Sequence, residues 1–283
     1  MALHEGYNRE TVANRDSFAG HRAAVTAHLL DVAGVGVAGA GPRGSCALLG
    51  AGNCNDVELA ALLARFERVH LIDLDAGAIA AARARLDEGV QARVVLHAPV
   101  DLGGGLARLA AWRTKRVTAA DLGRLPALAA AEALATVSER FDVVASCAIL
   151  SQIVHTCDSA LGGAHAELEA VACALVVAHL RTVVQLIAPG GRGIVVTDFV
   201  SSETFPLDEL WGSRAPLVLL DELERSENHL SGTGPTFLRR ILRTDDVVAK
   251  LVGRVHLVPP WLWHFNPQLT LLAYGLAFER VSG

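Results

Sequence analysis

The sequence lacks the cysteine pattern of a zinc site or of a disulfide framework. Its five cysteines are an odd number at irregular spacing, and no C-x-x-C pair occurs among them. Cys46 and Cys147 lie in apolar strand-like runs, where a cysteine usually serves as a small core residue. We therefore expect neither a metal site nor disulfide bonds.

The chain also lacks a secretory leader pattern and an uninterrupted apolar span. Its first ten residues, M-A-L-H-E-G-Y-N-R-E, contain no apolar core of the kind that signal peptides carry. The most apolar long run, Val171 to Ala188, is interrupted by His179, Arg181 and Gln185. It predicts a buried helix rather than a membrane span. Cytoplasmic localisation without a membrane partner is the expectation.

An excess of basic residues is missing as well. With 25 Lys and Arg against 30 Asp and Glu, the formal net charge is −5. Nucleic-acid binding needs a concentrated basic surface, so no nucleic-acid partner is expected. The 283 residues are 52% apolar and can bury a large core.

We predict a single domain over 1–283, made of an N-terminal helix and glycine-rich linker (1–44), a core (45–200), and an insertion with a strand hairpin (201–283).

The most informative stretch is residues 45–75. Cys46 to Leu49 is a short apolar run, typical of a buried strand, and it stops at G-A-G. Gly50 and Gly52 permit a tight turn and a close approach of the backbone to a ligand. Asp56 to Phe66 then has the spacing of a helix, with Asn55 as its expected N-cap, and Val69 to Ile72 predicts a second strand.

Asp73 ends that second strand, and it lies 73 − 52 = 21 residues beyond the second glycine. An acid about 20 residues after such glycines is where a ribose hydroxyl is held in nucleotide sites on parallel sheets. Dinucleotide sites also want a third glycine, G-x-G-x-x-G, but Asn55 stands at that position. An NAD(P)-dependent oxidoreductase is therefore an alternative rather than the leading hypothesis.

In these motifs the chain resembles the class I S-adenosylmethionine-dependent methyltransferases. Their first motif is an apolar strand followed by G-x-G-x-G, and their second strand ends in an acid. Leu48 stands where many members carry an acid, and Cys54 stands where the third glycine of that family falls. The resemblance implies S-adenosylmethionine as cofactor and a Rossmann-like, doubly wound α/β fold. That fold has a seven-stranded, mostly parallel sheet with an antiparallel last strand.

The resemblance also implies roles for individual residues. Asp73 would bind the ribose, and Asp101, after the third strand, would face the adenine amino group unless it only caps the next turn. The residues implied in cofactor binding are Gly50, Ala51, Gly52, Asn53, Asp73, Leu74, Asp101, Leu102, Ser146 and Cys147. Gly50, Gly52 and Asn53 would hold the methionine moiety, Leu102 would wall the base, and Ser146 and Cys147 would face the methyl-transfer centre.

Gln152 and His155 are the polar candidates for catalysis. A neutral His155 can remove a proton from a substrate, although a packing histidine is the better single reading. The residues that follow the predicted strand Phe141–Ala145, which form the fourth motif of the family, are not of the D/N-P-P-Y type. Methylation of nucleic-acid bases therefore loses support, and we expect a small-molecule acceptor. No residue selects among oxygen, nitrogen and carbon acceptors. A non-catalytic binding or scaffold protein is the third hypothesis.

The remaining chain completes the predicted sheet. We expect poor order over 1–15, a helix over Asp16–Val32 that either covers the ligand or packs on the sheet, and a flexible connection over Ala33–Gly44. Asp198 and Ser201 should lie at the ligand-facing edge, and 202–234 should be irregular. Trp261, Trp263, His264 and Phe265 either wall a pocket or plug the sheet edge. The other predicted elements are helices at Ala76–Leu86, Ala164–Ala188 and Leu238–Val252, two short helices within Leu106–Glu139 with one starting at Pro126, and strands at Arg93–His97, Phe141–Ala145, Arg192–Phe199, Gly253–Val258 and Leu269–Arg280.

Overall fold

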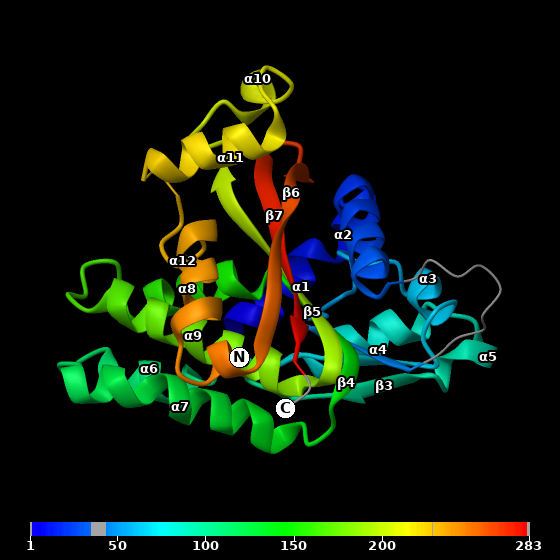
Figure 1. Cartoon of the computed structure of the whole chain (residues 1–283), viewed down its shortest axis with the longest axis horizontal. Coiled ribbons are helices and arrows are strands. Elements are labelled where there is room, and N and C mark those ends of the chain that lie inside the picture. The colour runs from blue at the N-terminus through cyan, green and yellow to red at the C-terminus, as the bar shows by residue number, and fades with distance from the viewer. Residues whose placement is uncertain (1, 35–43, 228, 282–283) are drawn as a thin grey trace.

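A computed structural model gives the fold, and it describes residues 2–34, 44–227 and 229–281. Most of the predicted glycine-rich connection, residues 35–43, lies outside the described residues. The chain forms a twisted sheet with helices on both faces (Figure 1). Its strands are β1 (Ser45–Leu49), β2 (Arg68–Ile72), β3 (Val94–His97), β4 (Phe141–Cys147), β5 (Ile187–Ser201), β6 (Val252–Asn266) and β7 (Leu269–Arg280).

The sheet has seven strands in the order β3-β2-β1-β4-β5-β7-β6. Neighbours from β3 to β5 are parallel, whereas β7 runs antiparallel to both β5 and β6. This order, with its reversed last strand, is the Rossmann-like fold that the resemblance implied, and the predicted fold class is confirmed. The parallel strands β1, β2 and β4 are short, apolar and mostly buried, as expected for strands covered by helices on each side.

The register brings the carboxyl ends of the central strands to one edge. Leu49, the last residue of β1, is paired with Ile72 on β2 and with Ser146 on β4, and Ile72 is paired with His97 on β3. The segments that follow these strands therefore begin side by side. In open parallel sheets this edge is where ligands bind.

One face of the sheet is covered by α6 (Leu106–Trp112), α7 (Ala119–Thr136), α8 (Ile149–Leu161) and α9 (Leu168–Leu186), seen at the lower left of Figure 1. Among the described residues, α9 alone is long and apolar enough to cross a membrane by length and composition, and 56% of that stretch is buried inside the structure. It packs against α7, α8 and the sheet. The prediction of a buried helix at this position is confirmed.

The other face is covered by α2 (Ala19–Val32), α3 (Leu59–Leu63), α4 (Ala76–Ala84) and α5 (Glu88–Gln91). Here the predicted cap was wrong. Helix α3 begins at Leu59 rather than near Asp56, and Glu58 is its N-cap residue. The Asn55 side chain instead donates a hydrogen bond to the Thr11 carbonyl, 2.8 Å away. This long-range bond turns the Asn55 side chain toward α1, and Asn55 lies four residues before the start of the helix.

Several other predictions need correction. Residues 2–14 are not irregular, because α1 (Ala2–Thr11) and a 3-10 turn (Val12–Asn14) form there. Pro126 lies inside α7 instead of starting a helix. The stretch 202–234 contains α10 (Leu207–Leu210) and α11 (Pro216–Arg225), and α12 (Pro235–Thr244) ends early, before the 3-10 turn Val248–Lys250. The P-P-W-L-W-H-F-N segment continues β6 rather than connecting two strands.

Candidate functional site

The turn after β1 has the tight glycine conformation that the sequence predicted. Gly50 and Gly52 have φ angles of 71° and 45°, in the left-handed region that favours glycine. A Cβ atom on Gly50 would lie 2.3 Å from Ile149 Cδ1 on α8. A side chain at that position would displace the Ile149 side chain, so packing as well as backbone shape favours the glycine.

Cys54 explains how the turn works without the third glycine of the family pattern. Its φ of 50° places a residue with a side chain in the left-handed region, and its amide donates to the Ala51 carbonyl at 2.7 Å. The backbone therefore keeps a glycine-like conformation in spite of the substitution. The side chain is buried, and burial raises the pKa of the Cys54 thiol, which keeps it protonated and unreactive.

Asp73 faces this turn from the end of β2. Its Oδ2 accepts a hydrogen bond from the Gly52 amide at 2.8 Å, and its Oδ1 accepts from the Asp75 amide at 2.9 Å. The residue is only 8% exposed, yet it lines both of the cavities described below. The carboxylate thus points into the crevice between the two strand ends, as a ribose ligand would require.

Helix α1 lies over the turn, which sequence reasoning missed. Asn53 Nδ2 donates to the Asn8 carbonyl at 2.6 Å, and Asn8 Nδ2 donates to Asp75 Oδ2 at 3.1 Å. A Cβ atom on Gly52 would meet Asn8 Oδ1 at 2.7 Å. Asn53 therefore has its amide turned toward α1. Only the Asn and Thr content of this polar stretch could have signalled a hydrogen-bonded helix.

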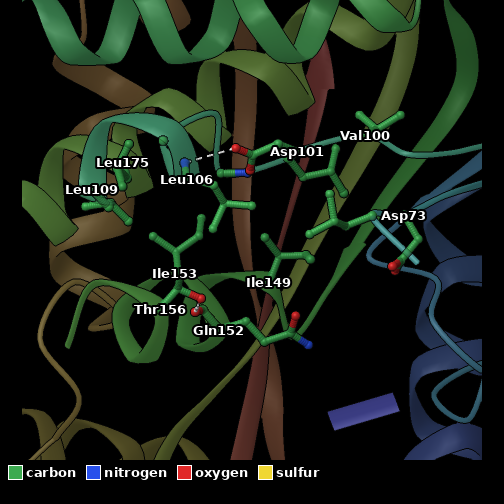
Figure 2. Close-up of a pocket in the computed structure, with 14 residues that line it drawn as sticks. Asp73, Val100, Asp101, Leu106, Leu109, Ile149, Gln152, Ile153, Thr156 and Leu175 are labelled. Atoms are coloured by element: carbon green, nitrogen blue, oxygen red, sulfur yellow. Dashed lines mark hydrogen bonds between the residues drawn. The ribbon is translucent and has the colours of Figure 1, made fainter. Parts of the chain in front are cut away.

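A narrow cavity, called the slot below, opens between the ends of β2 and β3 and α8 (Figure 2). Its volume is about 50 Å³. Leu74, Asp101 and Leu102, which were predicted to bind the cofactor, and Gln152, a catalytic candidate, line it. The complete lining is Asp73, Leu74, Val100, Asp101, Leu102, Gly103, Gly105, Leu106, Leu109, Ile149, Gln152, Ile153, Thr156 and Leu175.

Within the slot, Asp101 is engaged by its own loop. Its Oδ1 accepts from the Gly103 and Gly104 amides at 3.1 and 2.9 Å, and its Oδ2 accepts from the Leu106 amide at 3.1 Å. Asp101 therefore caps the turn that follows it, which is the second of the two roles considered for this residue from the sequence. The loop is thereby fixed in the shape that forms one wall of the slot.

Ser146 and Cys147 lie behind the site rather than in it, and neither lines the slot or the wider cavity. Ser146 is fully buried, with its Oγ 2.8 Å from His179 Nε2 on α9, and His179 Nδ1 is 3.1 Å from the Leu102 carbonyl. A carbonyl only accepts, so Nδ1–H donates to Leu102 and Ser146 donates to Nε2. Burial lowers the pKa of His179 to about 4, so the ring is neutral and ties the slot wall to β4.

A second and wider cavity, called the chamber below, has a volume of about 550 Å³. It shares Asp73 and Gln152 with the slot, so the two cavities meet at these residues. Gly50, Ala51, Gly52, Asn53 and His155, all of them residues predicted to bind the cofactor or to act in catalysis, also line it. The rest of the lining comes from residues of α1, Phe18, the 55–56 segment, the start of α8, 198–204, 229–230 and the β6–β7 hairpin.

The chamber carries titratable side chains. Ser151 Oγ donates to Asp198 Oδ1 at 2.5 Å. Burial raises the pKa of Asp198, while the Ser151 hydrogen bond and nearby His155 and His21 act in the opposite direction. His155 is exposed on α8 at the chamber wall. Asp198 and Ser201 line the chamber, which confirms their predicted place at the ligand-facing edge.

The aromatic group near the C-terminus lines the chamber and also contacts α2. Trp263 and Phe265 line the chamber, whereas Trp261 Nε1 donates to His21 Nδ1 on α2 at 3.1 Å. His21 stacks on Trp263 with ring centroids 4.0 Å apart, and Phe18 meets the same indole edge-on at 5.1 Å. The aromatics thus wall the pocket on one side and hold α2 against the sheet on the other.

Comparisons with known proteins add the following. No family model and no curated protein matches the sequence. One solved structure with a similar fold is the N-methyltransferase NodS of Bradyrhizobium japonicum WM9 in complex with S-adenosyl-L-homocysteine. The two sequences are 14% identical, the match covers 90% of this chain and 84% of that chain, and the TM-score is 0.40. CrArsM, an arsenic(III) S-adenosylmethionine methyltransferase of Chlamydomonas reinhardtii, matches with 14% identity over 94% of this chain and 74% of that chain (TM-score 0.42).

YcgJ of Bacillus subtilis, whose name states no activity, matches with 11% identity over 89% of this chain and 99% of that chain (TM-score 0.43). Identities and TM-scores in this range identify no family. The fold rests on the strand order of the sheet itself, which is the order of the methyltransferase Rossmann-like fold.

Proposed function

We propose that the protein is an S-adenosylmethionine-dependent methyltransferase that acts on a small-molecule acceptor. One observation carries the proposal: a narrow slot and a wide chamber meet at Asp73 and Gln152, directly beside the glycine turn. A donor placed across this junction would have its ribose at Asp73, its base in the slot and its amino-acid tail on Gly50 and Gly52. The reactive end would then face the chamber.

The charges of the chamber fit such a donor. The described residues that line it include Asp56, Asp73, Asp198 and Glu203, but neither lysine nor arginine. S-adenosylmethionine carries a sulfonium and an ammonium group, and when bound it supplies an electrophilic methyl group. An acidic, cation-free lining favours these positive groups by charge. The chain's own contribution is to hold donor and acceptor in line and to exclude water.

The same features argue against a dinucleotide. A pyrophosphate needs a helix N-terminus at the glycine turn, but α3 begins at Leu59, which is 59 − 52 = 7 residues beyond Gly52. Glu58 is the N-cap of that helix and Asp56 lines the chamber, so acids occupy the place where phosphates would bind. The NAD(P)-dependent alternative therefore loses support from geometry as well as from the missing third glycine.

The slot must widen to take a base. Its volume of about 50 Å³ is far below the roughly 300–1,000 Å³ of usual ligand pockets. The loop that forms its outer wall contains Gly103, Gly104 and Gly105, and it is held by the Asp101 carboxylate. We expect this loop to move outward when adenine enters.

The acceptor is proposed to be an amine or another cation. Asp198 and Glu203 line the chamber, and so does His155 on α8, which is close enough to Asp198 to lower its pKa. An ammonium group must lose its proton before it can attack a methyl group, and His155 and Asp198 are the available proton acceptors. Amines should therefore bind more tightly than carboxylic acids of the same size.

Titration calorimetry of the full chain with S-adenosylmethionine, S-adenosylhomocysteine and NAD tests the donor. Binding of the first two, with no heat from NAD, is the expected result. Binding of NAD alone would establish the oxidoreductase alternative, and binding of none would favour a scaffold protein. The acceptor is tested afterwards by methyl transfer from radiolabelled donor to matched amines, alcohols and carboxylic acids.

A further inference from the structure

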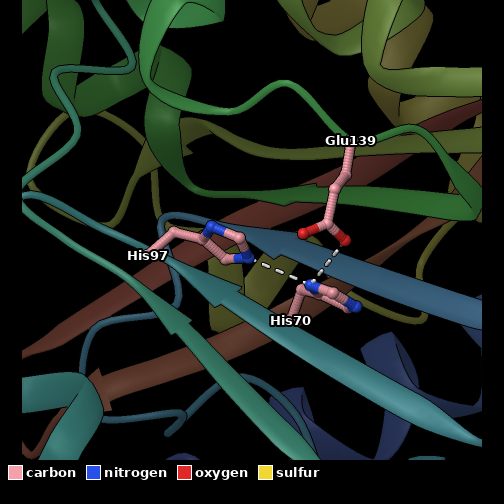
Figure 3. A group of neighbouring side chains, drawn as sticks. All are labelled: His70, His97 and Glu139. Carbon is pink, nitrogen blue, oxygen red and sulfur yellow. Dashed lines mark hydrogen bonds and ion pairs between the residues drawn. The ribbon is translucent and has the colours of Figure 1, made fainter.

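Three potential metal ligands gather on the α6–α9 face of the sheet, outside both cavities. His70 lies on β2, His97 ends β3, and Glu139 lies in the connection between α7 and β4 (Figure 3). None of the three lines the slot or the chamber. The proposed function makes no use of them.

The separations of their donor atoms suit a single ion. His70 Nδ1 is 3.0 Å from His97 Nε2 and 3.7 Å from Glu139 Oε2, and the three donor atoms lie within 4.8 Å of one another. Two ligands at about 2.0–2.1 Å from one zinc ion can be at most about 4.2 Å apart. The first two separations meet this limit, and rotation of the exposed Glu139 side chain brings the third within it.

The surroundings hold the two imidazoles in place before any ion arrives. His70 is 2% exposed and packs against the Phe141 ring, with centroids 4.6 Å apart. The His70 and His97 rings stack at an interplanar angle of 22°. Their close nitrogen pair shares one proton as a hydrogen bond, and a metal ion would take the place of that proton. Glu139 reaches the pair from the solvent side, which leaves coordination positions for water.

We propose that His70, His97 and Glu139 form a binding site for one divalent transition-metal ion, with Zn²⁺ as the first candidate. Two imidazole nitrogens and one carboxylate oxygen are a donor set that such ions prefer over Mg²⁺ or Ca²⁺. The ion would tie β2, β3 and the segment before β4 together. This inference stands independently of the proposed methyl transfer.

The test is titration calorimetry of the full chain with ZnCl₂ after removal of bound metal by a chelator, followed by Co²⁺ absorption spectroscopy. His97→Ala and Glu139→Gln are the informative variants, because both positions are less buried than His70. His165→Ala is a matched control, since His165 Nδ1 is also 3.7 Å from a glutamate, Glu167, but has no second imidazole in the cluster.

We expect one equivalent of Zn²⁺ to bind the wild type and His165→Ala, weaker binding by Glu139→Gln, and loss of the equivalent in His97→Ala. Circular dichroism should show that all variants are folded, and the melting temperature should rise with Zn²⁺ only where binding persists. An unchanged equivalent in His97→Ala would overturn the site. So would a thiolate charge-transfer band with Co²⁺, or no binding by the wild type, which would leave a plain hydrogen-bonded histidine pair.

Discussion

The slot and the chamber are built in different ways. The slot is lined by residues from one continuous part of the chain, 73–175, and its acid Asp101 is engaged by three backbone amides. The chamber draws on residues from Asn8 to Leu271, and it holds titratable side chains such as Asp198, His155 and Glu203. Recognition of a donor can therefore depend on local motifs, whereas recognition of an acceptor depends on long-range packing.

The largest expected effect concerns the wall of the slot. His179→Gln should destabilise the protein, because the neutral imidazole satisfies both Ser146 and the Leu102 carbonyl. The folded pKa of His179, about 4, lies below its usual 6.5, so the unfolded state binds more protons between these values. Stability present above pH 6.5 should thus be lost as pH falls toward 4, by about 3 kcal/mol at 1.36 kcal/mol per pKa unit.

Urea unfolding over that pH range measures this loss. The pH-dependent part should disappear in His179→Gln and persist in the control His256→Gln, since His256 is exposed on β6. A variant with the same pH slope as the wild type would show that His179 does not supply it.

The next largest effect is expected on donor affinity at Asp73, where the slot and the chamber meet. Asp73→Asn should weaken the binding of S-adenosylmethionine by about 1.5–3 kcal/mol, roughly 10- to 150-fold, because a hydrogen bond to a charged group is lost. Asp142→Asn is the matched control. Like Asp73, Asp142 accepts a hydrogen bond from a backbone amide: its Oδ2 is 2.7 Å from the amide nitrogen of Ser45, the first residue of β1. This bond lies at the opposite end of the strand from the glycine turn. Calorimetry that gave both variants the same donor affinity would remove Asp73 from the site.

A smaller effect should be confined to the chamber. Asn53→Ala removes the hydrogen bond to the Asn8 carbonyl, which is worth about 1 kcal/mol. Hydrogen exchange in α1 should accelerate by about 5-fold, and acceptor binding should weaken more than donor binding. Gln91→Ala, which loses an amide-to-carbonyl bond to Leu86 far from both cavities, should leave α1 unaffected. Equal loss of donor and acceptor affinity would mean that the chamber and the slot are not separable.

The smallest effect on stability is expected at Asp198. Its raised folded pKa means that the folded state binds the proton more readily, so its contribution to stability falls as pH rises above the usual value of 3.8. Asp198→Asn should remove this fall without loss of stability at neutral pH. Urea midpoints against pH check this, and the amine preference of methyl transfer should decrease in the same variant. An unchanged preference would move the selection of amines to other residues.

The same contrast explains how much the sequence alone could predict. The glycine turn, Asp73 and the individual parallel strands follow from short apolar runs and turn residues, which are local signals, whereas the sheet architecture was implied by the resemblance to a family. The placement of Ser146 and Cys147 failed because β4 is covered on both faces, by α9 on one side, so the cavity begins only after the strand ends. Helix α1 was missed because its docking depends on hydrogen bonds to residues more than forty positions away.

The way in which α1 is attached has a consequence for turnover. Its described contacts with the turn are single hydrogen bonds between amides, carboxylates and carbonyls, each of them weak beside the packing that holds the sheet. We therefore expect the N-terminal helix to detach more readily than the strands of the sheet. If methyl transfer occurs here, the spent donor has an exit at the start of the chain, and the speed of that opening would limit how fast the next cycle begins.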